Sequence, residues 1–294
     1  MRPRPGKPAL MDIFLLEAVI NGLLLGGVLA LLALGLNLIF GVVDVVWIAY
    51  AELVMCGMYA VYWFANVWGW PLLLACPAAI LLVAVMGVVV HRLIIEPILG
   101  SAPINQLLAT GGLLFFLQSF ATLLFGTDFR NLGVRLPPID LGEISISPAR
   151  LLAFGVALLG AVGLYVFLRR SYLGTAMRAI AQDREIMGLM GVDQRRIYLV
   201  TSAIGGGLAG LAACLLVLQY DVHPFIGLTF GPITFMICVL GGLGNMIGGF
   251  VAAFVISEII AITGYFVSIE ASYVVAFVVF IVLVFIRPQG ILGR

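Results

Sequence analysis

Residues 23–40 read LLLGGVLALLALGLNLIF, a run that contains no charged side chain and a single amide, Asn37. A helix that crosses the hydrocarbon layer of a bilayer, about 30 Å thick, needs about 20 consecutive apolar residues. A second run of this kind, Val274 to Ile286, lies near the other end of the sequence. Such runs indicate a protein that crosses a membrane several times.

The composition of the whole chain agrees with this interpretation. Of its 294 residues, 63 % are hydrophobic and 10 % are charged, and the mean hydropathy is +1.22. A soluble domain has about half apolar and about 25 % charged residues, so this chain lacks the polar surface to cover a soluble core. Its net charge of +1 also argues against a nucleic-acid partner. The sequence therefore predicts an all-α polytopic membrane protein, with the lipid bilayer as a partner.

Residue types that carry chemistry are sparse. Lys7 is the one lysine, and no Gly-x-x-x-x-Gly-Lys-Ser/Thr run is present to bind nucleotide phosphates. His91 and His223 stand alone, and neither a His-Glu-x-x-His nor a Gly-x-Ser-x-Gly motif occurs. The four cysteines are far apart in apolar stretches and are expected to be free thiols. We therefore expect no catalytic residue, no metal, no cofactor and no ATP hydrolysis by this chain.

About eight segments are long enough to span the membrane, and two further apolar segments are shorter. The short segments, 37–48 and 231–243, are bounded by glycine or polar residues, which is typical of broken or re-entrant helices that line a pathway. Alternatively, each of them extends a neighbouring helix. The long spans are expected at 13–35, 51–69, 71–91, 104–125, 150–169, 196–219, 247–266 and 272–287.

The distribution of arginine predicts the orientation. Six arginines lie in the stretch 169–196, and basic residues stay on the cytoplasmic side of a membrane. This stretch is therefore expected in the cytoplasm. The side of the N-terminal tail depends on the segment 37–48, because the tail is cytoplasmic only if that segment also crosses.

Carboxylates beside or within apolar runs are the first functional candidates, since an ionised carboxylate in the membrane is costly unless it is paired or hydrated. Asp44 and Glu52 flank a segment that also carries Trp47 and Tyr50. These residues could line a pathway, or they could form an aromatic belt at the membrane interface. Glu258 is a further carboxylate within a predicted span.

The stretch from Gly174 to Val192 predicts a short amphipathic helix in the arginine-rich segment. Such a helix could float at the lipid headgroups, or it could dock into a groove of a soluble partner. The residues expected near its apolar face are Met177, Ile180, Ala181, Met187 and Met190.

A glycine-rich stretch, residues 239–249, reads VLGGLGNMIGG. Its glycines superficially resemble a phosphate-binding loop, but no strand precedes them and no basic residue is near. Unwound backbone between a short helix and a full helix is the better interpretation.

Spaced motifs along almost the whole chain carry a family resemblance. In addition to the stretches 174–191 and 240–245, they are Asn21-Gly22, residues 109–118 (ATGGLLFFLQ), Phe125-Gly126 and residues 287–294 (RPQGILGR). In this order they resemble the permease family of branched-chain amino-acid ABC importers, specifically the LivH-type subunit.

The resemblance implies a permease subunit of the bacterial inner membrane, without a catalytic site. It implies a homologous permease subunit as partner in a heterodimer, two cytoplasmic ATPase subunits that use the ATP, and a periplasmic solute-binding protein. The stretch 170–195 would be the coupling loop, whose helix docks on an ATPase. Its candidate coupling residues are Arg178, Asp183, Met187 and Gly191.

The candidate pathway residues are Trp47, Tyr50, Glu52 and Asn245. The family typically reads Asn-Phe-Ala-His-Gly-Glu where this chain reads Trp-Ile-Ala-Tyr-Ala-Glu at 47–52, so only the alanine and the glutamate match. The expected substrate is a branched-chain or related amino acid, and urea and short amides are alternatives within the wider family.

A stand-alone carrier driven by protons, with Glu52 and Glu258 as relay carboxylates, is the alternative from another class. In either case we expect an N-terminal tail at 1–12, a single transmembrane domain at 13–287 and a C-terminal tail at 288–294.

Overall fold

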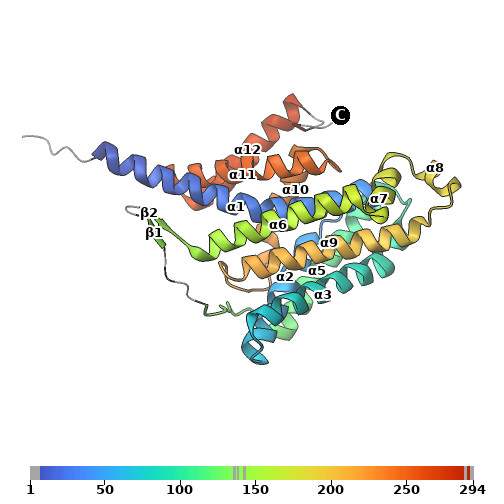
Figure 1. The fold of residues 1–294 in the computed structure, drawn as a ribbon, viewed down its shortest axis with the longest axis horizontal. Coiled ribbons are helices and arrows are strands. Elements are labelled where there is room, and N and C mark those ends of the chain that lie inside the picture. Colours follow the sequence, from blue (N-terminus) through green and yellow to red (C-terminus); the bar gives the residue numbers. More distant parts are fainter. Residues whose placement is uncertain (1–6, 135–136, 138, 142–143, 288–289, 292–294) are drawn as a thin grey trace, which may run out of the picture.

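The computed structural model describes residues 7–134, 137, 139–141, 144–287 and 290–291, and most of them are helical (Figure 1). A short antiparallel hairpin consists of β1 (Ile139–Leu141) and β2 (Ile144–Ile146). The α-helices are α1 (Lys7–Val43), α2 (Tyr50–Tyr62), α3 (Leu72–Val90), α4 (Glu96–Ile98), α5 (Pro103–Phe125), α6 (Pro148–Arg170), α7 (Tyr172–Gln182), α8 (Arg184–Leu189), α9 (Gln194–Leu216), α10 (Ile226–Gly241), α11 (Met246–Phe266) and α12 (Ile269–Ile286).

Seven helices in the described part of the chain are long and apolar enough to cross a membrane, which confirms the all-α polytopic membrane fold. The sequence predicted about eight. The difference is the span expected at 51–69, where the 13-residue α2 continues directly into a five-residue π-helix, Trp63–Val67. Another π-helix, His91–Ile95, extends α3.

The interpretation of 37–48 as a separate broken helix is wrong. Its first part, 37–43, forms the last turns of α1, and residues 44–49 connect α1 to α2 without forming a long helix. Asp44 ends α1 with a φ of 59°, in the left-handed region that is uncommon for residues other than glycine and in which aspartate is enriched. The alternative, that the segment extends its neighbour, is correct for this first part.

The second short segment, 231–243, falls mostly within α10, a 16-residue helix that contains Pro232. At a rise of 1.5 Å per residue, such a helix is about 24 Å long and shorter than the hydrocarbon layer. The chain then turns into α11 through Gly242 and Gly244, whose φ values are 95° and 79°. This segment is therefore a short helix followed by unwound backbone, as the glycine-rich sequence predicted.

Helix α1 crosses the bundle once and begins at the end that lies opposite to α7 and α8 (Figure 1). The sequence predicts an N-terminal tail on the same side as the coupling loop only if the segment 37–48 crosses the membrane as well. This segment does not form a crossing of its own, so the condition is not met. Helix α1 also includes residues 7–12 of the expected tail, while residues 1–6 lie outside the described part of the chain.

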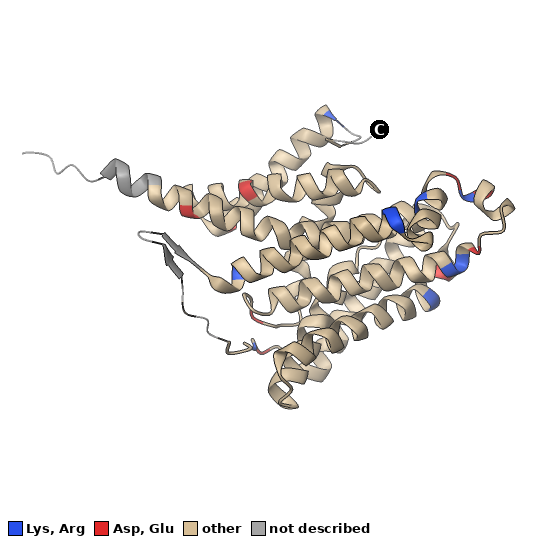
Figure 2. Ribbon diagram, in the orientation of Figure 1, with Lys and Arg blue, Asp and Glu red and all other residues tan. Residues whose placement is uncertain are grey.

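Charged residues gather at the end that carries α7 and α8, and few lie along the long helices (Figure 2). We call this end the basic end and define it by its arginines. They are Arg92, Arg169, Arg170, Arg178, Arg184, Arg195 and Arg196.

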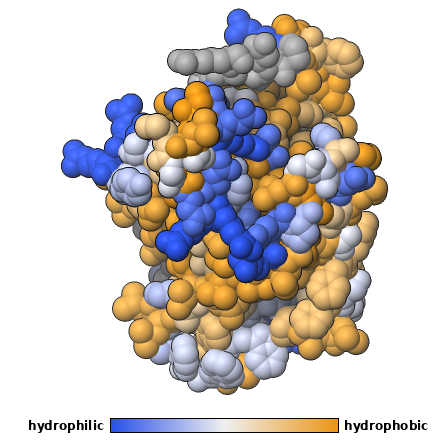
Figure 3. Space-filling view, turned by 90° about the vertical axis from the view of Figure 1, so that its right-hand side faces the viewer, coloured by the Kyte–Doolittle hydropathy of each residue, from blue (hydrophilic) through white to orange (hydrophobic). Residues whose placement is uncertain are grey.

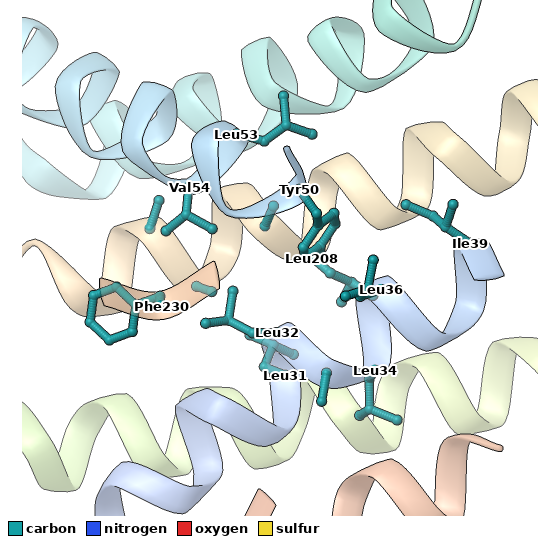
Figure 4. Packing of buried hydrophobic residues seen from close by; sticks show 14 of the residues in the cluster. Leu31, Leu32, Leu34, Leu36, Ile39, Tyr50, Leu53, Val54, Leu208 and Phe230 are labelled. Atoms are coloured by element: carbon teal, nitrogen blue, oxygen red, sulfur yellow. The ribbon is translucent and has the colours of Figure 1, made fainter. Parts of the chain in front are cut away.

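Helix α1 is the centre of the bundle. In its most apolar window 83 % of the residues are buried, against 11 % for α12. Leu31, Leu32 and Leu36 of α1 belong to one core cluster with Tyr50 of α2 and Phe230 of α10 (Figure 4). The fold is thus built around the helix that carries the uncharged run 23–40.

Small residues allow the closest helix contacts, as expected in lipid, where apolar burial alone does not drive association. On α1, a Cβ at Gly22 would meet Ala261 of α11 at 2.8 Å. On α9, a Cβ at Gly206 would meet the carbonyl oxygen of Val83 in α3 at 2.7 Å. Glycine therefore determines how closely α1 approaches α11 and α9 approaches α3.

The outer faces of α3, α5, α6 and α12 are apolar, with exposed side chains such as Leu81, Leu123, Leu159 and Phe285. Figure 3 shows the basic end with hydrophilic residues at its centre and hydrophobic flanks around them. Apolar area of this extent is unusual on a soluble protein and is the surface that lipid chains require.

Candidate functional site

A cavity of about 360 Å³ lies between α1, the connection 44–49, α2, α5 and α10. Three of the four predicted pathway residues, Trp47, Tyr50 and Glu52, line it. Much of the remaining wall is apolar and includes Leu107, Leu114, Leu228 and Phe235. The volume is within the range of small-molecule sites, about 300–1,000 Å³. The structure thus brings most of the predicted pathway residues to one cavity, which we call the central cavity.

Glu52 lies in the first turn of α2 and is 1 % exposed. Its Oε1 accepts a hydrogen bond from Nε2 of Gln118 on α5, at 2.9 Å. On the other side Gly227 of α10 lies so close that a Cβ at this position would overlap the carboxylate. Helix α10 can therefore pack against the carboxylate only because residue 227 is glycine.

Tyr50 has a structural role at the cavity wall. Its hydroxyl donates a hydrogen bond to the carbonyl oxygen of Gly205 on α9, at 2.9 Å. Gly35 of α1 leaves the space for this ring, because a Cβ there would overlap the hydroxyl. Trp47 packs edge-on against the Tyr50 ring, with centroids 6.3 Å apart. Tyr50 therefore ties α2 to α9 and supports Trp47.

Asn245, the fourth predicted pathway residue, does not line the central cavity. It is the N-cap of α11, where its side-chain oxygen accepts a hydrogen bond from the backbone N–H of Gly248 at 3.1 Å. Next to it, the N–H of Gly244 donates to Oδ1 of Asn37 on α1, at 3.2 Å. The α10–α11 turn is thereby fastened to α1.

The coupling loop contains two helices where the sequence predicted one. Helix α7 ends at Gln182, and Asp183 adopts an extended conformation before α8 begins. Asp183 caps α8, because its Oδ1 accepts a hydrogen bond from the N–H of Ile186 at 3.0 Å. The prediction of one continuous amphipathic helix from 174 to 192 is therefore wrong, since the capping aspartate restarts the helix.

The break changes which apolar residues face outward. Met177 and Ile180 of α7 are buried against the bundle, and Met187 of α8 is half-buried against the core. By contrast, Leu189 is 88 % exposed and Met190 is 75 % exposed. Sequence reasoning missed Leu189, because helical spacing across the break assigned the wrong face.

The remaining predicted coupling residues are at the surface. Arg178 and Asp183 are exposed, and Gly191, also exposed, ends the turn after α8 with a φ of 79°. The predicted coupling residues thus lie along one loop at the basic end, although Met187 faces the bundle.

An ion pair joins the coupling loop to the connection that carries Trp47. The guanidinium of Arg184, the first residue of α8, lies 3.2 Å from the carboxylate of Asp44. Both side chains are partly exposed, so the pair contributes only about 0–1 kcal/mol to stability. The pair places the first residue of α8 beside the residue at which the connection 44–49 begins.

Two loops at the opposite end of the bundle contact each other. The backbones of Arg130 and Val222 exchange two hydrogen bonds, and Nδ2 of Asn131 donates to Asp221. His223 packs beside the ring of Phe129 at 4.7 Å. Burial lowers the pKa of His223, against the opposing effect of Asp221.

We predict that replacing Asp183 with alanine loosens α8 without unfolding the bundle. Loss of an N-cap costs about 0.5–2 kcal/mol of local stability, so amide exchange in α8 should become roughly 2- to 30-fold faster. Hydrogen–deuterium exchange of peptides covering 184–190 measures this. Asp183→Asn is the matched control, because asparagine caps equally well. Equal exchange in the alanine variant and the wild type would contradict the capping role.

Among the described residues, no group of three or more His, Cys, Asp and Glu side chains is placed to hold a metal ion. The candidate functional features of the described chain are the central cavity and the coupling loop.

Known proteins with similar sequences show which family the chain belongs to. A family described as "Branched-chain amino acid transport system / permease component" matches residues 18–284. The chain is 29 % identical to the high-affinity branched-chain amino acid transport system permease protein LivH of Escherichia coli K12, over 96 % of both chains. It is 30 % identical to the corresponding permease protein BraD of Pseudomonas aeruginosa, over 95 % of this chain and 96 % of that protein.

Similarity to a solved structure supports the fold and nothing beyond it. The chain is similar to one in the structure of PsaBC from Streptococcus pneumoniae in complex with Fab, with a TM-score of 0.53, 13 % identity and 92 % of both chains covered. The match to the permease family, residues 18–284, spans nearly all of the membrane-embedded part of the chain. The protein therefore belongs to the family of permease components of branched-chain amino acid transport systems.

Proposed function

We propose that this protein is the transmembrane permease subunit of an ABC importer for branched-chain or related amino acids in the bacterial inner membrane. The observation that carries the proposal is the similarity to LivH and BraD over 95–96 % of the chain. The central cavity supports it, because a mostly apolar wall with one buried carboxylate suits a small amino acid with an apolar side chain.

The proposed partners are a second, homologous permease subunit, two cytoplasmic ATPase subunits and a periplasmic solute-binding protein. The chain has no P-loop lysine of its own, so the energy of ATP has to come from another subunit. The coupling loop is the proposed contact with an ATPase, through α8 and its exposed Leu189. The excess of arginine at the basic end supports its placement in the cytoplasm.

Reconstitution tests this function directly. The chain would be co-purified with the ATPases, second permease and binding protein encoded near it and placed in proteoliposomes. We expect uptake of radiolabelled leucine, isoleucine or valine that requires both ATP and the binding protein. The chain alone should show no uptake under a pH gradient.

Each alternative predicts a different result. Uptake of urea or a short amide in place of amino acids would assign the chain to another substrate class of the same family. Uptake by the chain alone, driven only by a pH gradient and lost in Glu52→Gln and Glu258→Gln, would contradict the ABC importer and favour the proton-coupled carrier.

A further inference from the structure

We infer that the central cavity binds a zwitterionic amino acid in a defined orientation, with the ammonium group at Glu52 and the carboxylate at Trp47 and Thr234. This inference rests on the proposed function and adds the residues that would recognise the two charges. The observation behind it is that three residues with unpartnered buried polar atoms line one cavity.

Trp47, Glu52 and Thr234 all line the central cavity, and their exposed fractions are only 1 %, 1 % and 2 %. Within the described part of the chain, Nε1 of Trp47, Oε2 of Glu52 and Oγ1 of Thr234 have no hydrogen-bond partner. Buried polar atoms are nearly always paired, because an unpaired one loses its hydration without compensation. Three residues with such atoms in the wall of one cavity point to a polar ligand.

The chemistry of these atoms selects the ligand. A carboxylate oxygen only accepts hydrogen bonds, an indole N–H only donates, and a threonine hydroxyl can donate. An ammonium group therefore fits Glu52, and a carboxylate fits the two donors. A neutral amide could not compensate the charge of the buried Glu52 carboxylate, whereas an ammonium group could.

The three residues come from different elements that meet only in the folded chain. Trp47 lies in the connection 44–49, Glu52 in α2 and Thr234 in α10. Gln118 of α5 is a positioning residue, since its hydrogen bond occupies Oε1 of Glu52 and leaves Oε2 without a partner.

The rest of the cavity would hold an aliphatic side chain. An apolar part of the wall consists of Leu107, Leu114, Leu228 and Phe235. A leucine-like side chain can pack against it, because such a side chain needs no hydrogen-bond partner. A cavity of about 360 Å³ is large enough for one small amino acid and leaves space for water. The site thus combines two charge contacts with one apolar pocket.

The test measures binding with ligands that carry one charge each. The assembled complex, in nanodiscs without ATP and without the binding protein, would be dialysed against radiolabelled leucine, 3-methylbutylamine or 4-methylpentanoate. The wild type should bind leucine more tightly than either analogue. Glu52→Gln should weaken the binding of leucine and of 3-methylbutylamine at least tenfold, because the variant removes the negative charge and keeps the shape of the side chain. The binding of 4-methylpentanoate, which has no ammonium group, should not change.

The complementary variants affect the other charge. Thr234→Val and Trp47→Phe should each weaken the binding of leucine and of 4-methylpentanoate several-fold. The binding of 3-methylbutylamine should not change. Glu258→Gln is the matched control, because Glu258 on α11 is a carboxylate in a membrane span but does not line the cavity. It should bind all three ligands as the wild type does.

Two results would overturn the inference: equal leucine binding by Glu52→Gln and the wild type, or equal weakening by Glu52→Gln and Glu258→Gln. Gel filtration of each variant complex separates these results from a folding defect. Gln118→Glu gives a second measurement of the same site, because it keeps a similar shape but disturbs the hydrogen bond that positions Glu52. Leucine uptake by the wild type with ATP and the binding protein tests the proposed function separately, so the complex can transport leucine even if this site is wrong.

Discussion

Replacing Gly248 with valine is expected to prevent the chain from accumulating as a folded membrane protein. Gly248 in the first turn of α11 faces the end of α10, and a Cβ at this position would overlap the carbonyl oxygen of Gly241. The reverse holds as well, since a Cβ at Gly241 would overlap the backbone of Gly248 and Gly249. Both partners are backbone, so neither can rotate away.

The expected cost exceeds that of an ordinary overpacked core. Overpacking by side chains costs typically about 1–3 kcal/mol when neighbours can adjust, and folded proteins have only about 5–15 kcal/mol in total. Here the turn is also held by the hydrogen bond from the N–H of Gly244 to Oδ1 of Asn37 on α1, so moving the turn would also break this contact. Fluorescence-detected gel filtration of a tagged chain in mild detergent should show loss of the monodisperse peak.

A glycine in the same helix provides the control. Gly264 of α11 has only Ser272 near its Cβ position, at 3.9 Å, an ordinary contact distance. Gly264→Val should therefore elute like the wild type, with a Tm within a few degrees. If Gly248→Val also gave a wild-type peak and Tm, the close α10–α11 contact would not be essential to the fold.

The second large effect is expected from Leu189→Glu, which should uncouple ATP hydrolysis from transport while leaving the chain folded. Leu189 is 88 % exposed at the end of α8, so the substitution removes little packing within the chain. In the proposed complex this side chain enters an ATPase groove, and burying an unpaired carboxylate there is costly. Stimulation of ATPase activity by the loaded binding protein should fall at least tenfold, together with amino-acid uptake.

Leu189→Met is the matched control, since methionine keeps the apolar character and similar volume. Asp183→Arg should also reduce stimulation, because it removes the cap of α8. Met187→Glu tests the site less cleanly, because Met187 is half-buried against the bundle and the variant also disturbs folding. Unchanged ATPase stimulation in Leu189→Glu, in a complex that still assembles, would contradict the docking role of α8.

Several parts of the structure could be predicted from local sequence. The long uncharged runs predicted the membrane helices, because hydropathy over about 20 residues determines whether a helix is stable in lipid. The glycines at 241–244 predicted unwound backbone between α10 and α11, since glycine readily adopts the left-handed conformation found at Gly242 and Gly244.

Two local features were misread because a single residue changed the backbone. Asp44 ends α1 in a left-handed conformation and Asp183 restarts a helix as its cap. Hydrophobic periodicity is insensitive to both events, because the apolar spacing continues on either side. The 37–48 segment and the single coupling helix were therefore predicted with the wrong boundaries.

By itself, the sequence determined the membrane class, most of the spanning helices and the family resemblance. It also determined that the arginine-rich end is expected in the cytoplasm. Each of these depends on residues that are neighbours in the chain. Tertiary structure alone decided which residues share a site. Thr234 resembles any helix residue in the sequence, yet it lines the same cavity as Trp47 and Glu52. That meeting depends on how closely α10 packs against α2. The approach is possible only because residue 227 is glycine, since the Glu52 carboxylate fills the space where a Cβ would lie.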